Sequence, residues 1–432
     1  MNSKCNLQNS SNNINTLTDH LFRHESGKMV SVLTKIFGTE NLETAEDVVQ
    51  QTFIDSMQVW KLKGIPDNPS AWLFRVAKNK AIDHIRRHKH AVQYDFNDNE
   101  RALLTSEYTL TTTMEHLWKE EAIQDDQLRM MFACCHPDIS AENQITLVLK
   151  TLCGFSTSEI AKAFLTSEDT VSKRLYRTRE FFRLQKIKLE IPSDQDLIKR
   201  TGSVLNSIYL LFNEGYNSTN SEDLIRRDLI DEAILLCKLL TENKNTQLPE
   251  AFALMALMCF HSSRIASRLT PEGEIILLSR QDRSKWNHNL IAEANEYMNK
   301  AAFGEKISSY HIEAAIAFEH CIADNFDTTN WERILELYDW LCKSSHSEIA
   351  EINRAVVILK LQGASAAMTA LHNLKDKNKV EDYYLYQSLL GEIYCEKNNK
   401  AKAKTHFEKA MRLTKSIKEK KLLSEKIKTL FY

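Results

Sequence analysis

The chain has 432 residues and a formal net charge of −2, so it is long enough for roughly two to four domains, and only local basic patches can attract nucleic acid. Its 10 glycines and 6 prolines are few for this length. This scarcity argues against β-sandwiches, barrels and glycine-rich nucleotide loops and favours an all-α fold. The N-terminus is polar and no run of about eighteen apolar residues occurs, so we expect a cytoplasmic protein that does not enter a membrane.

The first predicted helical unit covers residues 17–91. It opens with an apolar stripe at helical spacing, formed by Val30, Leu33 and Phe37. A second helix is expected after Thr44, which we interpret as its N-cap. The apolar face of this second helix comprises Val49, Phe53, Met57 and Trp60. Its polar face comprises Asp47, Gln50, Gln51 and Gln58.

Aromatic and basic side chains alternate in the third predicted helix, which reads AWLFRVAKNKAIDHIRRHKH. Its candidate DNA-binding residues are Trp72, Arg75, Lys78, Asn79, Lys80, Arg86 and Arg87. An aromatic ring can stack on an unpaired base while Arg and Lys hold phosphates, which is the chemistry needed to hold strand-separated DNA. A solvated basic helix face with Trp72 in the protein core fits the composition equally well.

The middle of the chain changes character twice. Residues 92–124 are acidic and rich in threonine and asparagine, so we interpret them as a mostly flexible linker. A second helical unit is expected over residues 125–188, ending in a strongly basic helix. The helix caps expected in this unit are Ser156, in a capping box with Glu159, and then Thr166 or Ser167.

The last two helices of this second unit have the pattern of a helix-turn-helix. Val171 and Leu175 should face inward. The outward face carries Ser167, Glu168, Thr170, Lys173, Arg174 and Arg177. Polar residues at the start of such a helix can meet base edges in a major groove, and later cations can meet phosphates. An ordinary helical hairpin with a charged face is the alternative.

Residues 190–432 form a series of amphipathic helices, which we divide into a helical extension at 190–290 and helical repeats at 291–432. One tetratricopeptide-like copy is clear from the offsets of Leu390, Gly391, Tyr394, Ala403, Phe407 and Ala410. Helical repeats present concave surfaces, so a protein or peptide is the expected partner. An unrelated helical bundle remains the alternative.

Polar residues interrupt the apolar helices of the extension. They are Asn213, Glu214, Gly215, Tyr216, His261, Arg264, Arg268, Asp282, Arg283 and Trp286. They could line a pocket or a docking surface, but we favour a buried ion-pair network that fixes helix packing. An enzyme with its active site in this region is a weaker hypothesis, because the sequence has no Walker loop, GxSxG or HExxH motif.

Cys134, Cys135 and His136 invite interpretation as a metal site. They lack a second ligand pair at zinc spacing, so we interpret them as a helix end terminated by Pro137. We therefore expect no catalytic residues, no metal and no cofactor.

Three motifs in order resemble those of the extracytoplasmic-function sigma factors of the sigma-70 superfamily. They are AEDVVQQTFIDSMQVW, NPSAWLFRVAKNKAIDHIRR and LKTLCGFSTSEIAKAFLTSEDTVSKRLYRTRE. FACCHPDIS, LFNEGY and QDRSKW resemble a subgroup of that family with a tetratricopeptide-like C-terminal extension. Three positions depart from the pattern: Arg280 replaces an acid, and Tyr176 and Thr178 replace small apolar residues.

The resemblance implies a non-enzymatic protein that joins core RNA polymerase and recognises promoter DNA. It places Asp47, Gln50, Gln51 and Phe53 in the segment that docks on the polymerase. It places Trp72, Arg75, Asn79, Arg86 and Arg87 at the minus-ten element, where DNA is opened and held. It places Thr170, Lys173, Arg174 and Arg177 on the helix that reads the minus-thirty-five element. The alternative function is a helix-turn-helix regulator with a sensing repeat domain that acts without polymerase.

Overall fold

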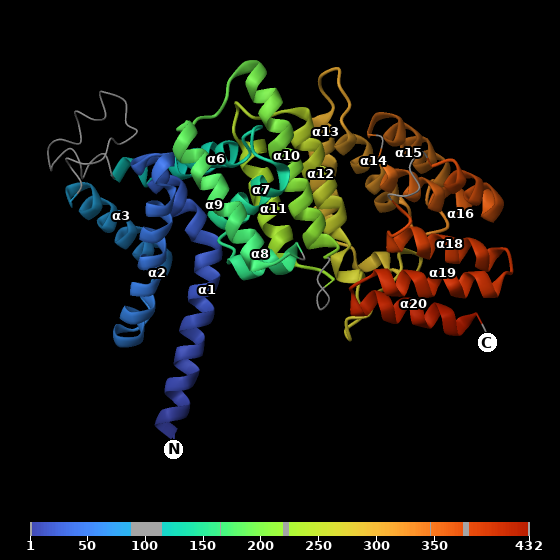
Figure 1. Cartoon of the computed structure of the whole chain (residues 1–432), viewed down its shortest axis with the longest axis horizontal. Coiled ribbons are helices and arrows are strands. Elements are labelled where there is room, and N and C mark those ends of the chain that lie inside the picture. The colour runs from blue at the N-terminus through green and yellow to red at the C-terminus, as the bar shows by residue number, and fades with distance from the viewer. Residues whose placement is uncertain are drawn as a thin grey trace. The chain divides into compact units, whose positions relative to one another are not determined.

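The computed structural model describes residues 2–87, 115–164, 166–218, 224–345, 347–374 and 380–430 (Figure 1). For residues 2–13, 162–163 and 194–195 it describes the backbone alone. Every element over the described residues is helical, apart from one isolated antiparallel bridge between Leu269 and Ile275. The expected all-α fold is confirmed.

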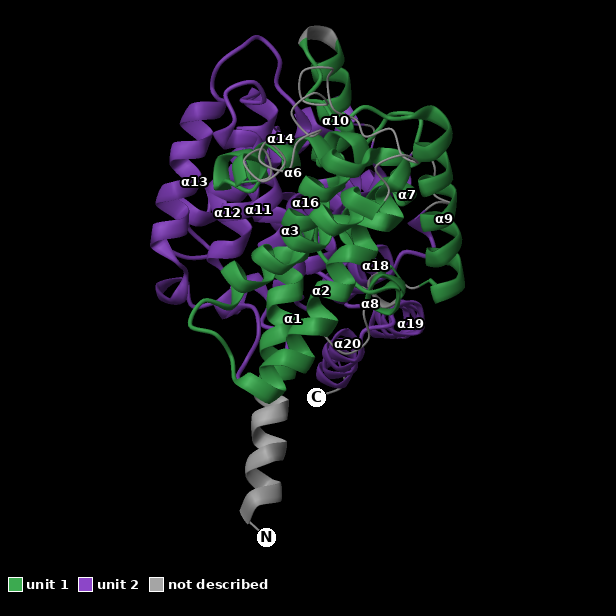
Figure 2. Cartoon of the chain, turned by 90° about the vertical axis from the view of Figure 1, so that its left-hand side faces the viewer, with its two compact units in different colours: residues 1–207 green, residues 208–432 purple. Residues whose placement is uncertain are grey.

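Two compact units divide the chain, residues 1–207 and residues 208–432 (Figure 2). Unit 1 contains α1 (Asn2–Phe37), the 3-10 turn η1 (Thr39–Asn41), α2 (Leu42–Lys63), α3 (Pro69–Arg87), α6 (Glu120–Cys134), α7 (Ala141–Thr151), α8 (Thr157–Ala163), α9 (Glu168–Gln185) and the first part of α10 (Asp194–Tyr216). Of the predicted linker, residues 92–114 lie outside the described residues, and α6 begins at Glu120.

Helix α1 forms the centre of unit 1 and packs on α2, α3, α6 and α7. Its apolar stripe is buried as predicted, with Val30, Leu33 and Phe37 each at most 4% exposed. The burial of these side chains removes apolar surface from water, which is the main favourable term in folding. The two predicted helical regions of unit 1 therefore share one core around α1.

The start of α2 differs from the expectation. Helix α2 begins at Leu42, and Thr44 lies inside it rather than at its N-cap. Gly38 has a φ of 88°, a conformation that favours glycine and lets the chain turn into η1 directly after α1. Leu42 is then buried against the core. The prediction of Thr44 as N-cap is wrong because the capping signature contains no information about the burial of Leu42.

Unit 2 continues as a series of helix pairs. It contains the end of α10, α11 (Arg227–Glu242), α12 (Pro249–Ser263), the 3-10 turns η2 (Ile265–Ser267), η3 (Leu278–Arg280) and η4 (Arg283–Lys285), α13 (His288–Ala301), α14 (Ser309–Ile322), α15 (Trp331–Ser345), α16 (Glu348–His372), α18 (Tyr384–Glu396), α19 (Lys400–Leu413) and α20 (Ile417–Thr429). Helix α12 is almost entirely buried and packs on α11, α13 and α14.

Three successive core clusters follow the helices from α14 to α20. The first is centred on Ile334 and Leu337, the second on Ile393, and the third on Ala403 and Phe407. Each helix thus buries its apolar face against helices close to it in sequence. A Cβ atom on Gly391 would lie 2.4 Å from the ring of Phe407, so α18 and α19 can approach this closely only through glycine.

Helix α16 is, by length and composition, the one helix among the described residues that could cross a membrane. Its backbone is broken at Gly363, where φ is 80°, so the helix is kinked rather than continuous. Ile352, Ile358 and Leu371, on both sides of the kink, belong to core clusters with neighbouring helices. These contacts give the apolar residues of α16 a role in the core of unit 2.

Candidate nucleic-acid interface

The predicted polymerase-binding residues lie on α2, but on two different faces. Asp47, Gln50 and Gln51 are exposed, and the side-chain amide of Gln51 donates to Asp55 at 2.8 Å. Phe53 is 4% exposed and meets the ring of Phe22 edge-on at 4.9 Å. The structure therefore brings together three polar side chains on the surface, whereas Phe53 anchors the helix from inside.

An aromatic contact fixes α3 against α2. Trp60, at the end of α2, is fully buried, and the half-buried Trp72 meets it edge-on at a ring distance of 5.5 Å. Trp72 therefore packs on Trp60 and stays partly exposed, and its contact with DNA remains a prediction. A half-buried indole held by an aromatic partner is a rigid platform for stacking.

The exposed face of α3 is strongly basic. Arg75, Asn79, Arg86 and Arg87 are exposed, and Lys78 is half-buried. The remaining predicted residue, Lys80, forms an ion pair with Asp55 of α2 at 2.7 Å. Asp83 is the acid within reach of the last turn, 3.9 Å from Arg86, and its backbone carbonyl accepts from Arg87 at 3.2 Å. The helix therefore presents solvated cations on one side and uses one lysine to tie itself to α2.

Helices α8 and α9 form the second predicted DNA-binding region. The capping box is confirmed: the amide of Ser156 donates to Glu159 at 2.8 Å, and the amide of Glu159 donates to the Ser156 hydroxyl at 3.2 Å. Ser167 caps α9 by accepting from the amide of Thr170. Val171 and Leu175 face inward, as predicted. The side chains of 162–163 and residue 165, between the two helices, lie outside the described residues.

The outward face of α9 carries the remaining predicted residues. Lys173 and Arg177 are exposed, and Arg174 is half-buried. Lys173 pairs with Asp169 one turn earlier at 2.7 Å. The two departures from the family pattern have different consequences: Tyr176 is 64% exposed, whereas Thr178 is buried and donates its hydroxyl to the Arg174 carbonyl. Packing therefore tolerates both departures.

A contact that the sequence pattern did not reveal joins α9 to α2. Arg179 donates to the buried Glu46 at 2.5 Å and lies 3.7 Å from the exposed Glu43. Burial raises the pKa of Glu46, although the attraction of Arg179 acts to lower it. Only the packing of α9 beside α2 turns this arginine toward a carboxylate.

A second contact joins α1 to α8. Arg23 donates to Glu159 at 2.5 Å, and its guanidinium lies over the ring of Phe155 at 3.8 Å. The hydroxyl of Thr39, in η1, donates to the carbonyl of Ile187, just after α9. These contacts hold the helix pair α8–α9 against the face of unit 1 that contains α1 and α2.

The cysteine-histidine run lies at a helix end, as expected. Helix α6 ends at Cys134. Cys134 and Cys135 are fully buried, and burial raises the pKa of both thiols. The sulfur of Cys134 contacts the Thr151 hydroxyl, and the sulfur of Cys135 contacts the Ser207 hydroxyl. Over the described residues, no group of three or more histidine, cysteine or acidic side chains is arranged to hold a metal ion.

Two arginines of the extension, Arg268 and Arg283, do not take part in the predicted ion-pair network. Arg268 donates to the carbonyl of Tyr216, and Arg283 donates to the carbonyls of His320 and Ala323 at 2.6 and 2.5 Å. Asp282 is exposed and caps η4 instead. Within the described part of unit 2, these arginines bind backbone oxygens rather than carboxylates, which corrects the expectation.

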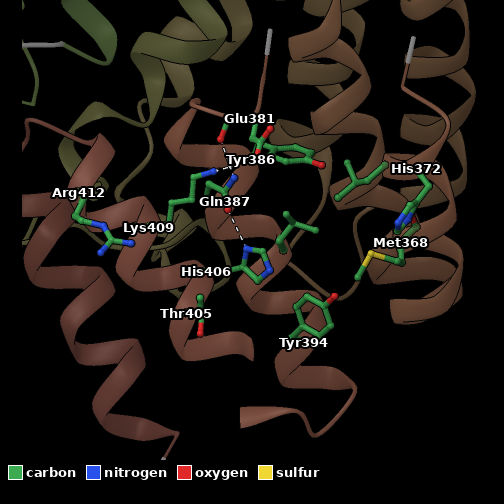
Figure 3. A pocket seen from close by; sticks show the side chains of 12 residues that line it. Met368, His372, Glu381, Tyr386, Gln387, Tyr394, Thr405, His406, Lys409 and Arg412 are labelled. Atoms are coloured by element: carbon green, nitrogen blue, oxygen red, sulfur yellow. Dashed lines mark hydrogen bonds and ion pairs between the residues drawn. The ribbon is translucent and has the colours of Figure 1, made fainter. Parts of the chain in front are cut away.

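The end of unit 2 contains a hollow of about 380 Å³ (Figure 3). Its lining includes Met368, Leu371, Leu390, Tyr394, His406 and Arg412. The side-chain oxygen of Gln387 contacts His406 Nδ1 at 2.9 Å, and Lys409 pairs with Glu381 at 3.2 Å. Figure 3 shows His406 and Lys409 on α19, with Gln387 of α18 beside them and Met368 of α16 on the other side of the hollow. The hollow therefore combines an apolar wall with a polar one.

Comparison with known proteins agrees with this geometry. Residues 21–91, which include α2 and α3, match the family model of Sigma-70 region 2. Residues 200–302 match a family of unknown function, DUF6596. An uncharacterized protein from Rhizobium meliloti (strain 1021) is 33% identical over 379 residues, which cover 88% of this chain and 88% of that protein. No solved structure is significantly similar to the chain.

The Sigma-70 region 2 match includes all the predicted residues of α2 and α3, with their exposed polar and basic faces. The match to the Rhizobium meliloti protein extends over most of both chains. Residues 21–91 therefore form a Sigma-70 region 2 domain, which supports a sigma-70 family member with a role in transcription initiation, and the chain shares its family with this Rhizobium meliloti protein.

Proposed function

We propose that the chain is a sigma factor of the extracytoplasmic-function type that joins core RNA polymerase and directs it to a promoter. The observation that carries this proposal is the exposed basic face of α3 beside the half-buried Trp72, inside the Sigma-70 region 2 match. Solvated arginines hold phosphates and an anchored indole stacks on a base. Together these groups suit DNA whose strands have separated.

In this proposal α2 supplies the polymerase contact. Asp47, Gln50 and Gln51 are exposed on one face of this helix, so they are available to a partner. Phe53 contributes indirectly, because its contact with Phe22 holds the helix in place. The polar face is complementary to a partner that donates hydrogen bonds and carries positive charge.

Helix pair α8–α9 is the proposed helix-turn-helix for the upstream promoter element. Thr170 lies in the first turn of α9, where side chains of a recognition helix meet base edges. Lys173, Arg174 and Arg177 follow at helical spacing, so they can contact bases or phosphates farther along the groove. The exposed Tyr176 would stand beside them.

The contacts between α9 and α2 define a closed arrangement of unit 1 that must open on a promoter. Arg179 contacts α2 at Glu46, and Trp72 contacts α2 at Trp60. Glu46 and Trp60 are roughly 21 Å apart along the helix at about 1.5 Å per residue. Elements centred about 10 and 35 base pairs upstream lie roughly 85 Å apart at about 3.4 Å per base pair. The two DNA-binding regions therefore have to separate before both can bind.

The second unit is proposed to control this activity in cis and to bind a protein or peptide. The hollow at its end has an apolar wall and a polar wall, which is what an extended peptide with alternating side chains requires. Covalent attachment keeps such a regulatory domain near millimolar effective concentration when the tether is short and flexible. Even a weak contact with the sigma domains would then be occupied.

Promoter-specific transcription with purified core polymerase tests the central proposal. The full chain plus core polymerase should initiate at a cognate promoter, and neither component alone should. Trp72→Ala should impair open-complex formation and leave duplex binding largely intact. The matched control is Phe74→Ala, which removes a neighbouring aromatic ring that packs on Trp118 at 5.6 Å.

A regulator that acts without polymerase would give a different result. It would bind duplex DNA sequence-specifically as the free protein and would not associate with core polymerase. For regulation in cis, a chain that ends after α10 should differ in activity from the full chain, with circular dichroism melting to verify its folding. Equal transcription by the two chains would contradict regulation by unit 2.

A further inference from the structure

Unit 2 contains a second cavity, of about 480 Å³, whose wall is formed by α10, α12, α14, α15 and α16. Its polar lining includes Asn213, Tyr216, His261, Arg264, Glu313 and His320. Small-molecule sites typically have volumes of about 300–1,000 Å³ and combine apolar walls with a few converging polar groups. The size and composition of this cavity fall within that description.

Arg264 brings a positive charge into the cavity without a carboxylate partner among the described residues. Its Nε donates to the hydroxyl of Tyr216 at 3.1 Å, and Nη2 lies 3.4 Å from Nδ1 of His261. The rings of Tyr216 and Trp286 lie 6.0 Å from its guanidinium carbon. Cations that are removed from solvent are normally paired with an acid, whereas the half-buried Arg264 makes these contacts with neutral groups.

The neighbouring groups do not supply the missing negative charge. Burial, assisted by Arg264 and Arg283, lowers the pKa of His320 to about 3, and burial, assisted by Arg264 and Arg268, holds the pKa of His261 well below its usual value. Both imidazoles are therefore neutral. Glu313 is the acid in the lining; burial raises its pKa, and its carboxyl group already accepts from Tyr209 at 2.7 Å.

A second polar group of the lining is also unsatisfied. Nδ1 of His320 is buried and has no hydrogen-bond partner among the described residues. The backbone carbonyl of the same residue is occupied, because it accepts from Arg283. Buried polar groups are almost always hydrogen-bonded, so a cation without an acid and an imidazole without a partner, in one cavity, indicate a place for a polar ligand.

We propose that this cavity binds a small organic anion, whose carboxylate or phosphate group contacts Arg264 and whose apolar body lies against Ile316, Ala317 and Leu341. An arginine can hold either anionic group through two parallel hydrogen bonds. The three apolar side chains belong to the same lining, so the ligand should be amphipathic rather than a bare inorganic ion. This site is independent of the proposed polymerase function, and its ligand binding can be measured without polymerase.

Calorimetric titration of the full chain tests the proposal with three probes that share a phenyl group and differ in their polar group. Phenylacetate and phenyl phosphate carry the two candidate anionic groups, and phenylacetamide is the neutral analogue of the first. One of the two anions should bind at least about tenfold more tightly than the amide, since a hydrogen bond to a charged group contributes this much. The preferred anion identifies the ligand class.

Variants then locate the binding site. Arg264→Gln should weaken binding of the preferred anion by about tenfold to a hundredfold. Arg333→Gln is the matched control, because Arg333 is exposed and pairs with Glu336, and it should leave affinity unchanged. Glu313→Gln should not weaken binding of the anion. In a cavity built for a cation, the same substitution would abolish binding.

Two outcomes would overturn the proposal. One is that neither anion binds the wild-type chain more tightly than phenylacetamide. The other is that Arg264→Gln binds the preferred anion as tightly as the wild type does. If Arg264→Gln fails to fold, the comparison of charged and neutral probes on the wild-type chain decides the question, together with the Glu313→Gln titration.

Discussion

Arginines have opposite environments in the two units. On α3 and α9 of unit 1, Arg75, Arg87 and Arg177 are exposed to solvent. In unit 2, Arg268 and Arg283 turn inward to backbone carbonyls and aromatic rings. A solvated guanidinium can exchange water for a phosphate at little cost, whereas one that satisfies buried carbonyls cannot be removed without leaving them unpaired.

This difference separates two functions that composition does not distinguish. The exposed arginines belong to the segments proposed to bind DNA, and the inward ones hold the helices of unit 2 together. Arg264 and Arg179 do not fit either class completely. Arg264 is inside unit 2 but lacks an acid, and Arg179 is on the basic helix α9 but pairs with the buried Glu46.

The largest effect is expected at Arg283, which binds the carbonyl end of α14. Arg283→Gln removes hydrogen bonds to the carbonyls of His320 and Ala323 and to the hydroxyl of Thr329. The free energy of unfolding should fall by about 2–3 kcal/mol, because hydrogen bonds to charged groups contribute about 1.5–3 kcal/mol and are not additive. Chemical denaturation of the full chain measures this change.

Arg87→Gln provides the control for that experiment. Arg87 is exposed, and surface substitutions of this kind usually change stability by less than about 0.5 kcal/mol. Equal losses from the two substitutions would remove the distinction between structural and exposed arginines.

The next effect concerns DNA recognition by α9. Arg174→Ala should weaken binding to the upstream promoter element by about 1–3 kcal/mol, relative to binding to a mutated element, if the side chain contacts guanine. If it contacts a phosphate, the loss should instead be uniform across sequences, with a salt slope smaller by about one. Binding of the polymerase complex to promoter variants at several salt concentrations separates these results. Arg183→Ala, beyond the reading residues and paired with Glu180, is the control.

The smallest effect is expected from opening unit 1 at Arg179. Removing the partner of a buried charge can cost about 3–5 kcal/mol, but Arg179 is 23% exposed and solvent screens the pair, so Arg179→Ala should cost about 1–2 kcal/mol. The variant should also bind promoter DNA more readily with core polymerase, because the closed arrangement is weakened. A stability loss without any change in promoter binding would contradict the proposed closed state.

The pH dependence of this variant has a definite sign. Burial raises the pKa of Glu46 in the folded chain, and an acid with a raised pKa contributes stability at low pH that is lost as pH rises through that pKa. Without Arg179 the pKa should rise further. The stability deficit of Arg179→Ala should therefore be small in acid and grow toward neutral pH. Adding Glu46→Gln should flatten this dependence, which denaturation at several pH values would show.

Local features of the molecule could be predicted from the sequence alone. The all-α fold follows from the scarcity of glycine and proline and from helical periodicity. The burial of Val171 and Leu175 and the capping box of Ser156 and Glu159 are confirmed, because both depend on residues within one turn of a helix. The domain boundaries and the roles of the DNA- and polymerase-binding residues stay predictions.

Features that join distant segments were decided only by tertiary structure. Arg179 and Glu46 are far apart in the chain, and Arg283 meets carbonyls of α14 rather than the acids near it in sequence. Helical periodicity determines which face of a helix is apolar, but it does not determine which helix that face meets. Whether a charge finds a carboxylate, a carbonyl or an open cavity therefore depends on how the helices pack, and this is why the pairing of Arg179 and the unpaired charge of Arg264 could not be predicted.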